Sequence, residues 1–197
     1  ENLIDEIISH LKYTGKDYSS NLVVFPGKRP SHFLRKAIAG KIKGSFIPPS
    51  IFSMDEFVDS TYEEMHSKRK LETIDAVAIL HEINKKAFRP IGGDTFLPLD
   101  SFFPIGLKIY RDIEELSIEG IKPVMVKQIE PFTGEAIPEH TLKRLQSLSF
   151  LYEEFYKLIE ERGRSTRSLR YRALSEGVAQ SGLDSYERII FAGFYAL

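Results

Sequence analysis

The stretch Asn21–Ile38, NLVVFPGKRPSHFLRKAI, decides the fold. Its apolar start, Leu22–Phe25, is short and continuous, which predicts a parallel strand buried on both faces. Pro26-Gly27 ends this run, and the basic turn Lys28–Ser31 leads into a helical pattern. Pro30 suits the first turn of a helix, where its missing N–H costs nothing. The stretch therefore predicts a strand, a turn and a helix, with backbone amides and two cations at a turn where α/β proteins hold anions such as nucleic-acid phosphates.

The Gly27-Lys28 pair does not belong to a phosphate-binding P-loop. That loop requires Gly-x-x-x-x-Gly-Lys followed by a Ser or Thr whose hydroxyl binds magnesium. Here Arg29 follows Lys28, and Leu22, inside the strand, holds the place of the first glycine. Two interpretations stay open from the residues alone: an anion-binding turn, or an ordinary strand–helix turn with surface cations.

The composition describes a globular protein with a sizeable core. Of 197 residues, 42% are hydrophobic and 28% are charged, which allows one large domain or a domain with an insertion. The absence of a long apolar run or a leader predicts no membrane association and a cytoplasmic location. With no cysteine, disulfides, thiolate catalysis and thiolate zinc sites are excluded. A net charge of −1 means that any nucleic-acid contact must come from local patches.

Helical spacing dominates the middle of the chain, whereas strand signals lie near its two ends. The residues predict a capping box at Ser53 and Glu56, an irregular segment over 120–138, a final strand over 188–194, and helices over 3–13, 28–43, 53–65, 72–88, 100–113, 141–161 and 168–179. Helices without strands between them cannot be βαβ crossovers. The prediction is an α/β core, residues 1–65 and 186–197, interrupted by an all-helical insertion, residues 66–185. The start on Glu1 and the strand at the end suggest a piece of a longer protein.

The spacing of the histidines and acidic residues predicts neither a metal site nor a catalytic site. The histidines lack metal-ligand spacing, and we expect His81, on an apolar face, to be a hydrogen-bonded core residue. The acidic pairs lie on helix faces, where we expect solvated carboxylates. No catalytic residue, metal site or cofactor is predicted for this segment. The residues considered are His10, His32, His66, His81 and His140, and the pairs Glu63-Glu64, Glu114-Glu115 and Glu160-Glu161.

Two basic groups stand out. The first follows the Leu22–Phe25 strand, and the second surrounds Tyr171 without an acid between its ends. Arginines interleaved with an aromatic side chain suit a phosphate backbone and base stacking. The alternative is a solvated helix end, where cations are favourable. The first group is Lys28, Arg29, Arg35 and Lys36, extended by Lys41 and Lys43, and the second is Arg162, Arg164, Arg167, Arg170 and Arg172.

Five segments, in chain order, resemble AddB-type helicase–exonuclease subunits. The first strand with PGKRPSHFLRK at 26–36 resembles the segment after the P-loop in superfamily 1 helicases, and more closely the AddB-type pattern VV(F/L)PxRRxxxFLRxxLA. PPSIFSMDEF at 48–57 is similar to the family's PxIxSxxEF. DSFFPIGL at 100–107 resembles its FYPWG, with Ile105 in place of the usual Trp. LRYR at 169–172 and IIFAGFYAL at 189–197 resemble its GxxYR and VIFxGFxAL segments.

This resemblance implies a truncated P-loop-NTPase-like parallel sheet with a large helical insertion. In an active helicase, an Asp-Glu pair at the end of the last strand would hold magnesium and position water. By the resemblance, Ala192 and Gly193 take those places as degenerate ATPase positions. The P-loop is also missing, so the resemblance implies a retained fold and a lost ATPase, with a nuclease part far downstream in the full-length protein.

The predicted function is that of the non-catalytic, helicase-like region of a bacterial double-strand-break repair subunit. It would bind single-stranded DNA and dock a motor helicase–nuclease subunit. The predicted DNA contacts are Lys28, Arg29, His32 and Arg35, then Arg167, Arg170 and Arg172. Two alternatives stay open: a protein-interaction scaffold without DNA contact, in which Phe102, Phe103 and Tyr110 dock a partner, and an ATPase whose P-loop precedes Glu1.

Overall fold

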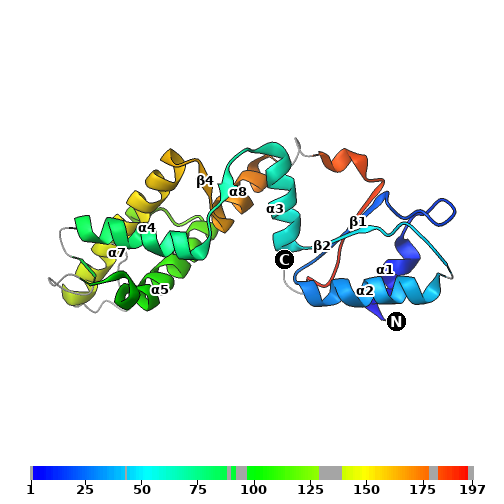
Figure 1. Cartoon of the computed structure of the whole chain (residues 1–197), viewed down its shortest axis with the longest axis horizontal. Coiled ribbons are helices and arrows are strands. Elements are labelled where there is room, and N and C mark those ends of the chain that lie inside the picture. Colours follow the sequence, from blue (N-terminus) through cyan, green and yellow to red (C-terminus); the bar gives the residue numbers. More distant parts are fainter. Residues whose placement is uncertain are drawn as a thin grey trace. The chain divides into compact units, whose positions relative to one another are not determined.

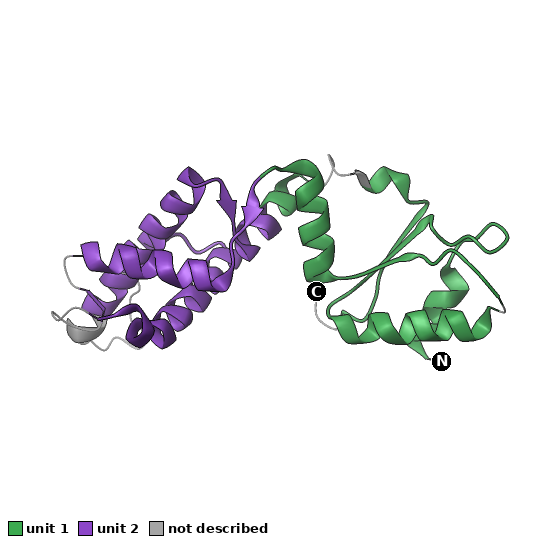
Figure 2. Cartoon of the chain, in the orientation of Figure 1, with its two compact units in different colours: residues 1–67, 173–197 green, residues 68–172 purple. Residues whose placement is uncertain are grey.

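The computed structural model has a mixed α/β architecture with a small parallel sheet (Figure 1). It describes residues 2–42, 44–87, 90–91, 97–128, 139–177 and 182–194. The chain divides into two compact units (Figure 2). Unit 1 comprises residues 1–67 and 173–197, and unit 2 comprises residues 68–172. The sequence placed the corresponding boundaries at 65/66 and 185/186.

Unit 1 is built on a parallel sheet with the strand order β2-β1-β5. The strands are β1 (Asn21–Phe25), β2 (Ser50–Ser53) and β5 (Arg188–Phe191). Leu22 pairs with Ser50 on one side and with Ile189 on the other. The predicted α/β core, formed from both ends of the chain, therefore has its first and last strands side by side in one parallel sheet. All five residues of β1 are buried, as its continuous apolar sequence predicts for a central strand.

Helices cover both faces of this sheet. Alternation along the strands puts Val23, Ile51 and Ile190 on one face, in a core cluster shared with α1 and α2. The other face carries Phe191, whose ring meets Phe57 of α3 edge-on at 5.8 Å. The helices are α1 (Leu3–His10), α2 (Lys28–Lys41) and α3 (Met54–Met65), followed in this unit by a short 3₁₀ helix (Gly182–Ser185).

Unit 2 has a separate core made by three long helices. Leu80, Phe102 and Phe155 are fully buried in it, one from each helix. The core helices are α4 (Thr73–Lys86), α5 (Leu99–Ile118) and α7 (Glu139–Glu161), accompanied by α6 (Pro123–Lys127) and by the start of α8 (Arg167–Gly177), at which the unit ends. Each unit therefore buries its own apolar side chains.

The prediction that the insertion is all-helical is wrong, because two short strands pair within it. Arg69 pairs with Arg164, and Lys70 with Ser165, in a two-residue parallel ladder of β3 (Arg69–Lys70) and β4 (Arg164–Ser165). Strands this short and this charged carry no apolar alternation, so no local signal marks them. The segment 120–138, predicted to be irregular, contains α6, which begins on Pro123, and its residues 129–138 lie outside the described part.

Candidate nucleic-acid interface

The carboxyl ends of the three strands of unit 1 meet at one edge of the sheet. Pro26 and Gly27 follow β1 there, and Ala192 and Gly193 follow β5. An ideal Cβ on Gly193 would lie 3.8 Å from Pro26 Cδ, so the two turns are neighbours. Gly193 has a φ of 78°, in the left-handed region that favours glycine. The structure thus brings the predicted degenerate ATPase positions beside the basic turn, at the edge where open α/β sheets bind ligands.

A polar cluster links this basic turn to the start of α3. Lys28 Nζ lies 3.0 Å from Glu56 Oε1, and the Ser53 backbone N–H and hydroxyl both donate to Glu56 Oε2 at 2.9 Å. The Ser53 hydroxyl also accepts from the Glu56 N–H, which completes the predicted capping box. The hydrogen bond from the Ser53 backbone, followed by that from Lys28, lowers the pKa of Glu56 to about 2. Lys28 is therefore held by an ion pair while its side chain stays largely exposed.

The other predicted contacts on α2 differ in how available they are. Arg35 donates through Nη2 to the Ile51 carbonyl at 2.9 Å and thereby holds α2 to β2. Arg29 and His32 are exposed, and neither forms a hydrogen bond or ion pair with the described residues. Lys41, at the far end of the helix, lies 2.7 Å from Asp5 Oδ1. Lys43 lies outside the described residues.

The second basic group is mostly engaged inside unit 2. Arg170 is fully buried, and its Nε donates to Ser165 Oγ at 3.0 Å. A buried guanidinium cannot reach a DNA backbone, so the predicted contact by Arg170 is wrong for this conformation. Arg172 donates to the carbonyl and hydroxyl of Ser117, both at 2.9 Å. Arg167 is exposed and lies over the Tyr171 ring, 4.6 Å from its centroid.

A buried polar network around Glu114 joins α5, α7 and α8. Glu114 is 8% exposed and accepts hydrogen bonds from Tyr156 at 2.6 Å and from the Ser168 backbone N–H at 2.9 Å. The prediction that this carboxylate is solvated is wrong, because it caps the first turn of α8 from another helix. Burial, followed by the charge of Glu114, raises the pKa of Tyr156 and keeps the phenol protonated.

Aromatic residues predicted for the scaffold alternative lie in or beside the core of unit 2. Phe102 is 0% exposed, and Phe103 and Tyr110 are half-buried. The proposed docking role of Phe102 is therefore wrong for this conformation. His81 is a hydrogen-bonded core residue, as predicted, because its Nε2 lies 2.7 Å from the Leu97 carbonyl and its ring packs 5.1 Å from that of Phe102.

The described part of the chain contains no cluster of three or more His, Cys, Asp or Glu residues that could bind a metal ion. None of its helices combines the length and the apolar character needed to cross a membrane. Comparison with known proteins adds no identification, because no protein-family model and no curated protein matches the sequence.

Proposed function

We propose that this chain is a helicase-like, non-catalytic region that binds single-stranded DNA and docks a motor subunit, as the resemblance to AddB-type repair subunits implies. The observation that carries the proposal is the parallel pairing of β1 with β5 after the long helical excursion of unit 2. In P-loop-NTPase-like sheets, strands distant in sequence lie side by side in this way, with ligands at their carboxyl ends.

The basic turn supports DNA binding at that edge. Arg29 and His32 lie on the first two turns of α2, directly after β1, and both are exposed. A phosphate near the start of α2 would gain from the helix dipole and from the Arg29 charge. Lys28 is next to them, but it must exchange its contact with Glu56 for a phosphate oxygen. We therefore assign Arg29 the larger share of the electrostatic attraction.

The residues at the same edge support the proposal that this region has no ATPase activity of its own. Ala192 and Gly193 offer no carboxylate for magnesium, and Arg29 follows the Gly27-Lys28 pair where a P-loop has a Ser or Thr. The region would therefore guide a strand without hydrolysing nucleotide itself. The motor would then be supplied by the partner subunit.

The proposal is tested by the salt dependence of binding to a labelled oligo-dT, measured by fluorescence anisotropy. Each lost phosphate contact lowers the slope of log K against log salt by about 0.7 for single strands. Arg29→Ala should show this decrease, and Lys28→Ala a smaller one because its ammonium already has a partner.

Lys41→Ala is the matched control, because it removes the same charge from the far end of the same helix, where Lys41 pairs with Asp5. We expect its slope to stay at the wild-type value. Equal slopes for wild type and Arg29→Ala would contradict the proposal. So would an equal decrease for Arg29→Ala and Lys41→Ala, since that would reflect net charge alone.

A further inference from the structure

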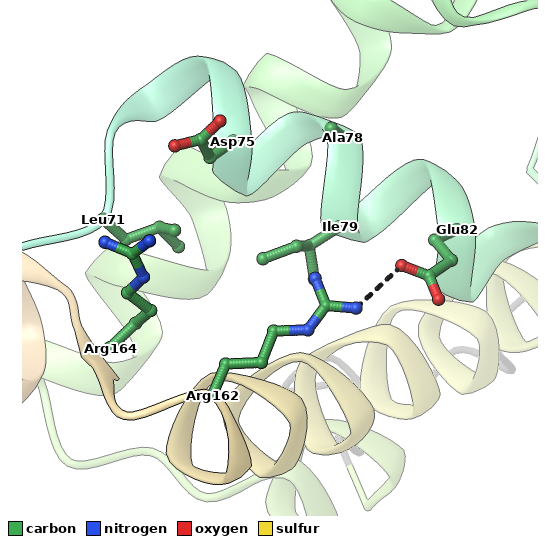
Figure 3. A pocket seen from close by; sticks show the side chains of 7 residues that line it. All are labelled: Leu71, Asp75, Ala78, Ile79, Glu82, Arg162 and Arg164. Carbon is green, nitrogen blue, oxygen red and sulfur yellow. Dashed lines mark hydrogen bonds and ion pairs between the residues drawn. The ribbon is translucent and has the colours of Figure 1, made fainter.

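Unit 2 contains a pocket of about 310 Å³ between α4 and the segment that joins α7 to β4 (Figure 3). Its apolar part is formed by Leu71, Ala78 and Ile79, and the remaining lining residues are charged. The volume is at the small end of the range for ligand pockets, so it suits a group the size of one nucleotide.

The walls of the pocket are fixed by hydrogen bonds. Leu71 donates its N–H to the Ser165 carbonyl at 2.8 Å, directly after the β3–β4 ladder. At the other end, Arg162 crosses to Glu82 and its Nη2 lies 3.0 Å from Oε2 (Figure 3). Hydrogen bonding by Arg162 lowers the pKa of Glu82. The charges of Arg162 and Glu82 therefore compensate each other, and their ion pair forms one side of the pocket.

The remaining two charged side chains have no such compensation. Arg164 is half-buried next to Leu71, and Asp75 lies on the first turn of α4 (Figure 3). Neither side chain forms a hydrogen bond or ion pair with the described residues. A guanidinium keeps its charge at any physiological pH, and partial burial without an acceptor is unfavourable. The pocket thus offers one cation and one carboxylate, from opposite walls, around an apolar surface.

We infer that this pocket holds one unstacked nucleotide of a single strand and favours a base with an exocyclic amine. The base would lie against Leu71 and Ile79, Arg164 would contact its phosphate, and Asp75 would accept from the amine. Carboxylates accept hydrogen bonds from cytosine N4, whereas thymine presents a carbonyl at that position. This inference rests on the proposed single-stranded DNA binding, but it concerns unit 2 and predicts a base preference that unit 1 does not require.

The test compares binding of oligo-dC and oligo-dT of equal length at neutral pH. Wild type should prefer oligo-dC by about tenfold, which corresponds to one hydrogen bond with a charged partner. Asp75→Ala should remove the preference by weakening oligo-dC binding. Arg164→Ala should weaken both oligonucleotides alike and lower the salt slope by about 0.7. Circular dichroism and thermal unfolding check that each variant is folded.

Two exposed residues of α5 outside the pocket lining provide matched controls, Glu115→Ala for the lost carboxylate and Arg111→Ala for the lost guanidinium. Neither should change the base preference or the slope. Equal binding of both oligonucleotides by wild type, or an Arg164→Ala effect no larger than that of Arg111→Ala, overturns the inference. If the Arg29→Ala slope still decreases, the proposed function survives that result. If wild type binds neither oligonucleotide, both proposals fail.

Discussion

Replacing Glu56 by glutamine should lower the stability of unit 1 at neutral pH and make its α3 cap less sensitive to acid. Glu56 accepts two hydrogen bonds from Ser53 and contacts the Lys28 ammonium. Glutamine is isosteric and retains a carbonyl oxygen that can accept from the Ser53 N–H, so the substitution mainly removes the charge. The stability difference between the two proteins therefore isolates what ionisation of Glu56 contributes.

The magnitude follows from the pKa of this carboxyl, which the hydrogen bonds from Ser53 and Lys28 lower from 4.5 to about 2. At 1.36 kcal/mol per pKa unit, the full effect would be about 3 kcal/mol. The Glu56 side chain is 43% exposed, so solvent screens both the ion pair and the hydrogen bonds. Discounted for that screening, the contribution is about 1 kcal/mol.

The pH dependence has a definite sign. Because folding lowers the pKa, ionised Glu56 stabilises the folded state above its usual pKa of 4.5, and this contribution disappears as the pH falls towards about 2. Urea unfolding followed by circular dichroism, at a series of pH values, measures the difference between wild type and Glu56→Gln. It should be about 1 kcal/mol at neutral pH and shrink towards zero across the acid range. A difference that is absent at neutral pH, or constant across all pH values, would refute the reasoning.

Three further substitutions test the backbone and the buried network. Gly193→Ala should lower the free energy of unfolding by about 1–2 kcal/mol, because a φ of 78° disfavours any Cβ, although this one would meet no atom nearer than 3.7 Å. The control Gly40→Ala, in α2, should instead stabilise the protein by up to about 1 kcal/mol. Equal unfolding free energies for both variants would argue against backbone strain at Gly193. Tyr156→Phe should cost about 1–3 kcal/mol, because it leaves the buried carboxylate of Glu114 without its 2.6 Å donor. A Tyr156→Phe variant as stable as wild type in urea would mean that the Ser168 N–H and hydroxyl, which already donate to Glu114, satisfy the buried carboxylate by themselves.

The elements that sequence predicts well are those whose signal is local. The continuous apolar run of β1 predicts a central strand, and its five buried residues agree. The Ser53 and Glu56 spacing predicts the start of α3, because the reciprocal cap involves only four consecutive residues. The pairing of β1 with β5 was also predictable, since an α/β core made from the two ends of the chain needs their apolar strands in a common sheet.

The elements that sequence misses depend on partners far along the chain. The β3–β4 ladder joins Arg69 to Arg164, and neither strand has a pattern of its own. Glu114 has an unremarkable place in an acidic pair, but its hydrogen bonds come from Tyr156 and Ser168 on later helices. No periodicity within one helix reports such a contact, because the cost of burying the carboxylate is offset by donors that only the fold supplies.

The same distinction decides which cations remain to bind DNA. A run of arginines in sequence predicts a basic surface, but a guanidinium has five donors, which carbonyls and hydroxyls of its own protein can also satisfy. Arg170 and Arg172 are held in this way by Ser165 and Ser117. The sequence predicted DNA contacts at Arg170 and Arg172 but not at Arg164, whose guanidinium has no acceptor among the described residues. If the salt slope falls for Arg164→Ala but not for Arg172→Ala, the electrostatic attraction lies with the uncompensated charge and not with the density of arginine in the sequence.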